Sequence, residues 1–335
     1  MNIYLIIITI LVIIIVYLFF KSYKVKSNFY YSNNSQKLNY ICTGELANSC
    51  NQYPVWLGKR NMMQLFNISN KPNATIYVNS FNLDYFIKNI HDKLENNYIL
   101  VSGGDDHTIP YDIKAYKKIL SSNKCIKWFS QNCISIHPKL ECIPIGLDYH
   151  TMSYTEKSRL SNKSAISPMK QEQELIEIKN KFMDLRKTKL KAVANFQYNS
   201  MNMYMSTFGN KSCKNRKQAY HALKNKDVVV WLPKQSRKDF WKECDKYAFV
   251  VSPFGNGIDC HRTWEALVLG RIPIIFKHKI NTIFDDLPVV IVDDWNKISR
   301  PFLEKEFDKI IKNWDTYNFD KLTLNYWARK INQEV

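Results

Sequence analysis

The segment 249–276 constrains the fold of this chain more than any other part of the sequence. It begins and ends with short runs of β-branched and apolar residues bounded by serine, glycine and proline, and each run predicts a buried strand. Between the two runs, apolar residues recur at helical spacing: Ile258, Trp264, Leu267 and Val268. We expect Asp259 to cap this helix and Gly270 to end it. Strand, loop, helix and strand in this order predict a parallel sheet covered by helices.

The loop before the predicted helix has the composition of an anion site. Gly255 and Gly257 lie at the turn from strand to helix, where free backbone N–H groups can face an anion. Arg262 follows in the first helical turn, and Glu265 lies three residues further along the same face. A guanidinium beside a helix N-terminus suits a diphosphate, and a carboxylate one turn deeper can accept hydrogen bonds from two ribose hydroxyls. The spacing equally fits an ion pair on a solvated helix face and glycines that only form a turn.

The motif S-P-x-G-x-G-x-D-x-x-R-x-W-E-A-L-x-x-G-x-I-P-I, at residues 252–274, resembles the C-terminal signature of exostosin-like glycosyltransferases. This resemblance implies the GT-B fold, an α/β architecture in which two Rossmann-like domains face each other across a cleft. It also implies that the C-terminal domain binds a nucleotide-sugar donor. A weaker similarity covers three short stretches at the end of the N-terminal domain: 128–132, 137–139 and 143–148.

The resemblance and the chemistry of a diphosphate together predict a donor site. Its expected residues are Ser252, Gly255, Asn256, Gly257, Asp259, Arg262, Glu265 and Arg216. Arg216 and its neighbour Lys217 follow a predicted strand that ends at Phe196, although Arg216 also fits the solvated start of a helix. Ser252 and Asn256 either bind phosphate or sugar or only shape the turn.

A transferase that inverts the anomeric carbon, as the resemblance implies, needs a general base on the acceptor side. Asp105, Asp106 and His107 follow a predicted strand, and ligand clefts form at the carboxyl ends of parallel strands. These three residues are therefore the first candidates for the catalytic base, followed by His137 and Asp148. Aspartate and glycine at a strand end are also ordinary turn formers.

The sequence predicts transfer without a metal or other cofactor. Enzymes of the GT-A type hold a divalent cation with an Asp-x-Asp motif, and the acidic pairs of this chain do not have that spacing. The paired glutamates of retaining GT-B enzymes are also absent, because Pro273 stands where the partner of Glu265 would lie. Arginine and a helix N-terminus are expected to neutralise the diphosphate instead.

Residues 3–20 form an apolar run long enough to span a bilayer, and lysines follow it without a cleavage site. We expect an uncleaved signal-anchor. The resemblance favours a type II protein of the Golgi or endoplasmic reticulum, whereas lysines placed after the span favour a cytosolic domain. Five sequons would be glycosylated only on the lumenal side: Asn33, Asn67, Asn73, Asn162 and Asn210.

Apolar runs alternate with helical patterns along the rest of the chain, which predicts parallel sheets flanked by helices. The predicted elements include a helix at 111–120 and a strand at 142–145. The expected parts are a transmembrane anchor at 1–20, a stem at 21–39, an acceptor-side domain at 40–150, a linker and helix at 151–187, and a donor-binding domain with C-terminal helices at 188–335. A helix capped by Ser167, with Pro168 in its first position, is expected within the linker. The eight cysteines are scattered without a Cys-x-x-Cys pair, which argues against zinc and leaves disulfides possible.

The net charge of +18 over 335 residues is spread along the chain without a dense basic run or a nucleic-acid-binding motif. A nucleic-acid partner is therefore not expected, and a basic cleft for an anionic substrate or an anionic membrane surface explains the sign. The sequence predicts a membrane-anchored glycosyltransferase that transfers sugar from a nucleotide diphosphate sugar to a glycan or glycoprotein. The alternatives are a fucosyltransferase-like enzyme with a GDP-sugar donor, and a non-catalytic membrane protein that binds glycan or a partner.

Overall fold

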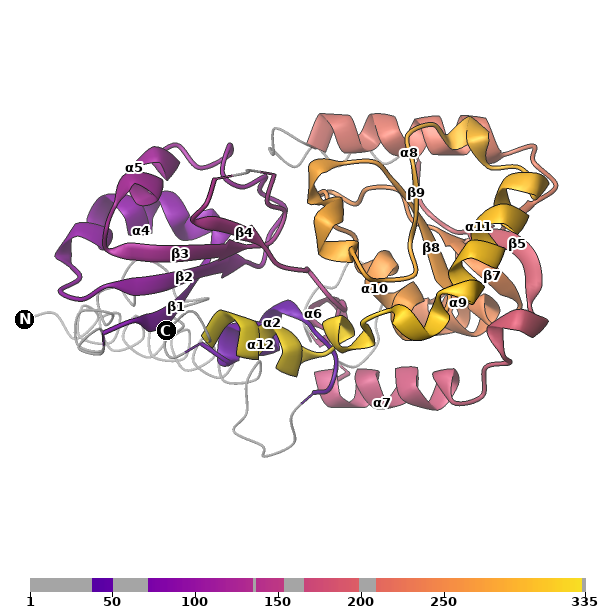
Figure 1. Ribbon diagram of the computed structural model, residues 1–335, viewed down its shortest axis with the longest axis horizontal. Helices are drawn as coiled ribbons and strands as arrows, with labels where there is room; N and C mark the ends of the chain where they lie inside the picture. The colour runs from indigo at the N-terminus through magenta and orange to yellow at the C-terminus, as the bar shows by residue number, and fades with distance from the viewer. Residues whose placement is uncertain (1–37, 51–71, 135–136, 154–165, 199–208, 333–335) are drawn as a thin grey trace, which may run out of the picture. The chain divides into compact units, whose positions relative to one another are not determined.

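The computed structural model describes residues 38–50, 72–134, 137–153, 166–198 and 209–332, which belong to one compact unit starting at Leu38. Its strands form two separate parallel sheets, with helices in most connections between successive strands (Figure 1). The expected α/β architecture is therefore confirmed. The predicted anchor at 1–20 and nearly all of the predicted stem lie outside the described residues. Among the helices that are described, none is long and apolar enough to cross a membrane.

The N-terminal sheet has four parallel strands that lie side by side in chain order. They are β1 (Ala74–Asn79), β2 (Tyr98–Gly103), β3 (Cys125–Ser130) and β4 (Leu140–Cys142). Every residue of β1 and β2 is buried, as expected of parallel strands covered on both faces. The connections contain η2 (Ser80–Asn82), α4 (Leu83–Asn89), η3 (His91–Lys93) and α5 (Tyr116–Ser121).

Two of these elements are shorter than the sequence predicted. The helix expected from residue 111 begins only at Tyr116, because the Asp112 carboxylate accepts the Thr108 N–H at 2.7 Å and holds the preceding stretch in turns. The strand expected to reach residue 145 ends at Cys142. Its last residue, Ile145, donates its N–H to the Asp259 carboxylate at 2.8 Å instead of to a neighbouring strand.

The C-terminal sheet has five parallel strands in the order β6-β5-β7-β8-β9. They are β5 (Lys189–Ala194), β6 (Val229–Trp231), β7 (Tyr247–Val251), β8 (Ile272–Phe276) and β9 (Val290–Val292). The chain first runs outward from β5 to β6 and then returns to the other side of β5 with β7. In open parallel sheets, such a reversal opens a crevice at the carboxyl ends of the two strands that flank it.

Helices cover both faces of this sheet, and they are α8 (Gly209–Leu223), α9 (Arg237–Cys244), α10 (His261–Val268) and α11 (Arg300–Lys312). Phe249 and Val251 pack in one apolar cluster with α8 and α11, whereas Val250 packs in another with α9 and α10. This alternation is the two-residue period of a strand buried on both sides. Shorter 3-10 segments are η4 (Leu185–Lys187), η5 (Lys279–Phe284) and η6 (Trp295–Lys297).

The position of the loop between β7 and α10 depends on where α10 begins and ends. Gly270 has φ of +68°, its N–H donates to Leu267 O, and the next N–H donates to Ala266 O, so the predicted glycine C-cap is confirmed. The predicted N-cap is wrong. Cys260 occupies the N-cap position, and its side chain forms no capping hydrogen bond. The Asp259 carboxylate accepts hydrogen bonds from the Ile145 N–H and from Trp264 Nε1 instead of capping the helix.

The remaining helices are α2 (Thr43–Asn48), α6 (His150–Ser153), α7 (Pro168–Lys179), η7 (Trp314–Thr316), η8 (Phe319–Leu322) and α12 (Leu324–Asn332). The Ser167 side chain caps α7, as predicted. Neither α2 nor α12 was predicted, and the two pack together. Tyr40 pairs with Thr323 just before them. The predicted domain boundaries stay predictions.

None of the seven cysteines whose side chains are described forms a disulfide. Most of them are buried, and burial raises the pKa of Cys42, Cys50, Cys125 and Cys244 to about 12. These four are therefore inert thiols that pack as small apolar side chains. The disulfides that the sequence left possible are therefore not found among these seven cysteines.

Candidate functional site

A cleft of about 550 Å³ opens where the strand order of the C-terminal sheet reverses. Asn195 follows β5 and Gly255 follows β7, and both line this cleft. Asp106 lines it from beyond the end of β2, and Asp148 from beyond β4. The cleft therefore collects residues that follow the carboxyl ends of strands in both sheets, which is where ligands of parallel sheets bind.

The negative and positive charges of the side chains that line the cleft nearly cancel. Four carboxylates and three guanidiniums take part: Asp106, Asp148, Asp259 and Glu265, and Arg216, Arg237 and Arg262. The net charge of +18 is therefore not concentrated among the described residues that line the cleft, and in this part of the chain the expected basic cleft is not found. The individual positions of these groups decide what can bind.

The structure places Arg216 and Arg262 on the cleft, as predicted. The Nε of Arg216 donates to Phe254 O at 2.7 Å, which fixes this guanidinium beside the loop that follows β7. The guanidinium of Arg262 lies over the Phe240 ring, 5.3 Å from its centre. Among the described residues, neither Arg262 nor Glu265 has an ion-pair partner within 4.0 Å. The ion pair within the helix, which was the alternative interpretation of these two residues, is not found.

Lys217 and Ser252 lie away from this cleft. Lys217, the neighbour of Arg216, lines a different cavity of about 690 Å³. The Ser252 N–H continues the strand ladder to Ile274 O, and its Oγ lies 2.9 Å from Thr263 Oγ1 in the core. Ser252 thus holds α10 against β7.

The start of α10 offers fewer N–H groups to an anion than the sequence suggested, because two of them are already used. The Asp259 N–H donates to Asn132 Oδ1 at 3.0 Å, and the Cys260 N–H donates to Asp259 Oδ1 at 2.8 Å. Asn132 lies just after β3, so its side chain joins the two halves of the unit. An anion in this cleft would depend mainly on the arginine side chains.

Gly257 is required by the close approach of Asn132. A Cβ at Gly257 would lie 2.8 Å from both side-chain polar atoms of Asn132, whereas a Cβ at Gly255 would have no neighbour nearer than 3.6 Å. We therefore expect Gly257→Ala to cost about 1–3 kcal/mol of unfolding free energy, as overpacking does. A thermal unfolding curve would show a midpoint lower by several degrees. Gly255→Ala is the matched control and should unfold within about 2 °C of wild type; equal midpoints for the two variants would contradict this account.

The Asp259 carboxylate is buried and holds other groups in place. It accepts hydrogen bonds from the Ile145 N–H at 2.8 Å and from Trp264 Nε1 at 3.0 Å. Asp259 also lines the cleft, but these contacts give its oxygens a structural use. Burial raises its pKa to about 6 in spite of these donors.

This raised pKa predicts a pH-dependent contribution to stability. The folded chain binds the Asp259 proton more tightly than the unfolded chain, whose pKa is 3.8, so the contribution is complete below pH 3.8 and is lost as pH rises through about 6. Asn at this position does not titrate. We expect the unfolding free energy of wild type minus that of Asp259→Asn to fall by about 2 kcal/mol between about pH 4.5 and about pH 7.5. Unfolding curves of both proteins at the two pH values measure this, and a constant difference would contradict it.

The predicted base candidates separate in the structure. Asp106 lines the cleft, and burial, followed by the nearby Asp105 carboxylate, raises its pKa. Asp105 and His107 pair with each other instead, with Asp105 Oδ1 2.7 Å from His107 Nδ1, and neither lines the cleft. His137 lies outside the cleft as well, where its Nδ1 accepts the Lys139 N–H.

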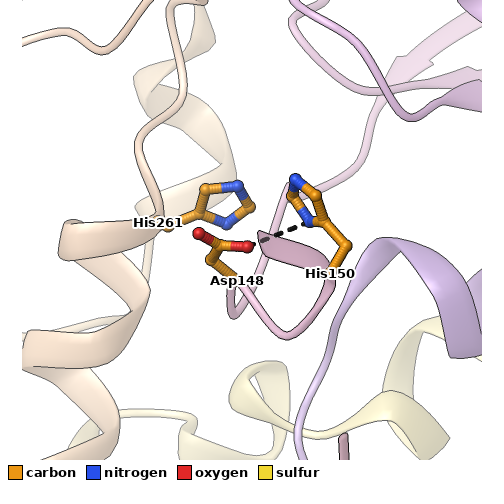
Figure 2. A group of neighbouring side chains, drawn as sticks. All are labelled: Asp148, His150 and His261. Carbon is orange, nitrogen blue, oxygen red and sulfur yellow. Dashed lines mark ion pairs between the residues drawn. The ribbon is translucent and has the colours of Figure 1, made fainter. Parts of the chain in front are cut away.

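Asp148, the last of the predicted candidates, lies in a cluster with two histidines (Figure 2). Its carboxylate lies between the imidazoles of His150 and His261, and one potential ligand atom from each residue lies within 4.8 Å of the others. Although burial alone would raise it, the pKa of Asp148 lies well below its usual range because His261, His150 and Arg237 surround the carboxylate. Sequence reasoning missed His150, His261 and Arg237. Only the place of His261 inside the glycine-loop segment could have indicated one of them.

No protein-family model matches this chain, and no curated protein matches it. Several solved structures resemble it distantly. One is an α1,3-fucosyltransferase with GDP-fucose, at 13% identity and a TM-score of 0.39, covering 84% of this chain and 88% of that one. Another is the OtsA apo structure, at 11% identity and a TM-score of 0.40, covering 82% and 76%. A third is an α,α-trehalose 6-phosphate synthase from Burkholderia multivorans, at 7% identity and a TM-score of 0.39, covering 82% and 74%.

Proposed function

We propose that this chain is a glycosyltransferase of the GT-B type that uses a nucleotide diphosphate sugar, as its exostosin-like motif implies. One observation carries the proposal. A single cleft at the strand-order reversal combines arginines near the start of α10 with carboxylates that follow strands of the other sheet. This is the combination that a transfer reaction needs, since cations stabilise the leaving diphosphate and a carboxylate accepts the acceptor's proton.

Arg262 and Arg216 are the proposed ligands of the diphosphate. Arg262 lies in the first turn of α10, so its charge acts in the same direction as the helix dipole. Its lack of an ion-pair partner among the described residues leaves the guanidinium available to an anion. Arg216 is held by the Phe254 carbonyl, which belongs to the loop after β7. Negative charge that develops on the β-phosphate as the glycosidic bond breaks would be stabilised by both guanidiniums.

Glu265 is the proposed ligand of the donor's ribose. It lies on the cleft with only 7% of its surface exposed, and burial raises its pKa. The nearby charge of Arg237 offsets this cost of burial only in part, so the carboxylate can accept further hydrogen bonds. The two vicinal hydroxyls of a ribose would supply such donors.

Asp106 is the proposed general base of an inverting displacement. The acceptor oxygen forms its bond to the anomeric carbon while the bond from that carbon to the β-phosphate oxygen breaks. Asp106 takes the hydroxyl proton, and the electron pair leaves with the nucleoside diphosphate. A carboxylate with a raised pKa is a stronger base than Asp148, whose pKa lies well below its usual range.

We further propose that residues 1–20 anchor the enzyme in a membrane with its catalytic part in the lumen, where the acceptor is a glycan or glycoprotein. Glycosidase treatment of the protein made in a eukaryotic cell tests the orientation. A lower apparent mass after treatment is expected, since sequons such as Asn73 are modified only in the lumen. An unchanged mass would favour the cytosolic orientation that the lysines after the span suggest.

Nucleotide binding is the test of the proposed function. The full-length chain, purified in detergent, would be unfolded thermally with UDP, GDP or CMP and with their sugars. A ligand at 100 times its Kd that binds only the folded state adds about 2.7 kcal/mol, which raises the midpoint measurably. Stabilisation by UDP or by GDP identifies the donor class. Stabilisation by GDP and not by UDP or CMP would favour the fucosyltransferase-like alternative. A folded chain that responds to no nucleotide would overturn the proposal in favour of a non-catalytic binding protein.

A further inference from the structure

The cluster of Asp148, His150 and His261 has the composition of a transition-metal site. Two imidazoles and one carboxylate are the donor set that suits divalent first-row ions such as Zn²⁺, Co²⁺ and Fe²⁺. Ligands at about 2.0–2.2 Å from such an ion lie at most about 4.4 Å apart. The three candidate ligand atoms already lie within 4.8 Å of one another, so small side-chain rotations would complete the shell.

Hydrogen bonds hold Asp148 and His261, the two less exposed of the three candidate ligands. Nδ1 of His261 lies 2.7 Å from Gly146 O, and because a carbonyl only accepts, Nδ1 carries the proton and Nε2 is left as the ligand atom. Metal-binding histidines are characteristically held in this way by a backbone carbonyl. Oδ1 of Asp148 accepts the Thr151 N–H at 3.0 Å, while Arg237 donates to the main-chain carbonyl of Asp148. The carboxylate lies close to both imidazoles (Figure 2).

The site opens to the cleft. His150 exposes 46% of its side chain and Asp148 exposes 20%. An ion held by three protein ligands keeps at least one position for water or for an oxygen of a bound ligand. The charge balance of the cleft favours such an ion as well, because the carboxylates outnumber the guanidiniums by one before any anionic ligand enters.

We propose that Asp148, His150 and His261 bind one divalent transition-metal ion in the cleft. This differs from the sequence-based expectation of a metal-independent site, which considered only paired aspartates. Metal binding itself does not depend on the proposed glycosyl transfer, so its test can be made without any nucleotide.

The test is a titration of the full-length chain with Co²⁺ after EDTA treatment and dialysis, followed by visible absorption. We expect one Co²⁺ per chain with bands of nitrogen and oxygen ligation, displaced by Zn²⁺ but not by Mg²⁺, which prefers oxygen ligands. His150→Gln and His261→Gln should each weaken binding at least about tenfold. His221→Gln, a histidine on α8 that lines the other cavity, should bind like wild type.

Three results would overturn the proposal. The first is equal Co²⁺ binding by wild type and by the double variant His150→Gln/His261→Gln. The second is a thiolate-to-cobalt charge-transfer band, which would assign the metal to cysteine. The third is wild-type affinity for Co²⁺ in the single variant His150→Gln. His150 is half-exposed, so this substitution should leave the fold intact. Nucleotide-induced stabilisation measured on the same variants shows separately whether the proposed function stands.

Discussion

Replacement of Arg262 with alanine is expected to weaken binding of the nucleotide diphosphate by at least about 100-fold while leaving the fold intact. Arg262 is half-buried on the cleft, and its guanidinium contacts the Phe240 ring without an ion-pair partner among the described residues. A guanidinium that forms a two-point contact with a phosphate makes two charge-assisted hydrogen bonds. Each contributes about 1.5–3 kcal/mol, so the loss should weaken binding by at least about 100-fold. Isothermal titration with the nucleotide that stabilises wild type measures this change.

Two variants make the Arg262 result specific. Arg262→Lys keeps the positive charge but lacks the planar fork, so we expect its Kd to lie between those of wild type and Arg262→Ala. Arg300→Ala is the matched control, because Arg300 also lies in the first turn of a helix, α11, but pairs with Asp227 away from the cleft. Its Kd should equal that of wild type. Equal weakening by Arg262→Ala and Arg300→Ala would mean that only the net charge of the chain matters.

The central unit of the C-terminal sheet could be predicted from sequence because each of its signals is local. β7, α10 and β8 follow from a strand-length apolar run, a helical repeat and a glycine that ends the helix, and β8 has the predicted bounds. The helix start was misplaced at Asp259, because a capping aspartate looks the same as one whose carboxylate is used by Ile145. That partner lies far away in the chain, and no local pattern indicates it.

Those site residues that have a local signal could also be predicted from the sequence. Arg262 and Asp106 were found because each stands beside a strand end or a helix start. His150 and His261 were missed because their common site forms only when the segment after β4 meets the start of α10. Asp148 and His150 do have the spacing of an Asp-x-Asp pair, with histidine in the second place. A search restricted to carboxylates excludes this pair, although imidazole is the better ligand for a transition metal.

Replacement of Asp106 with asparagine is expected to lower kcat by about 10²–10⁴-fold, the usual contribution of a general base, with little change in nucleotide affinity. Asp105→Asn is the matched control, because this adjacent carboxylate pairs with His107 and does not line the cleft. Its kcat at high pH should stay near that of wild type, although loss of the Asp105 charge lowers the Asp106 pKa. The base must be ionised, and burial raises the Asp106 pKa, so wild-type kcat should rise with pH along a limb displaced upward from that of an ordinary aspartate. Asp106→Asn should lose this limb. Unchanged turnover after combined substitution of Asp105, Asp106 and His107 would place the base elsewhere, and Asp148 would then be the next candidate among the carboxylates on the cleft.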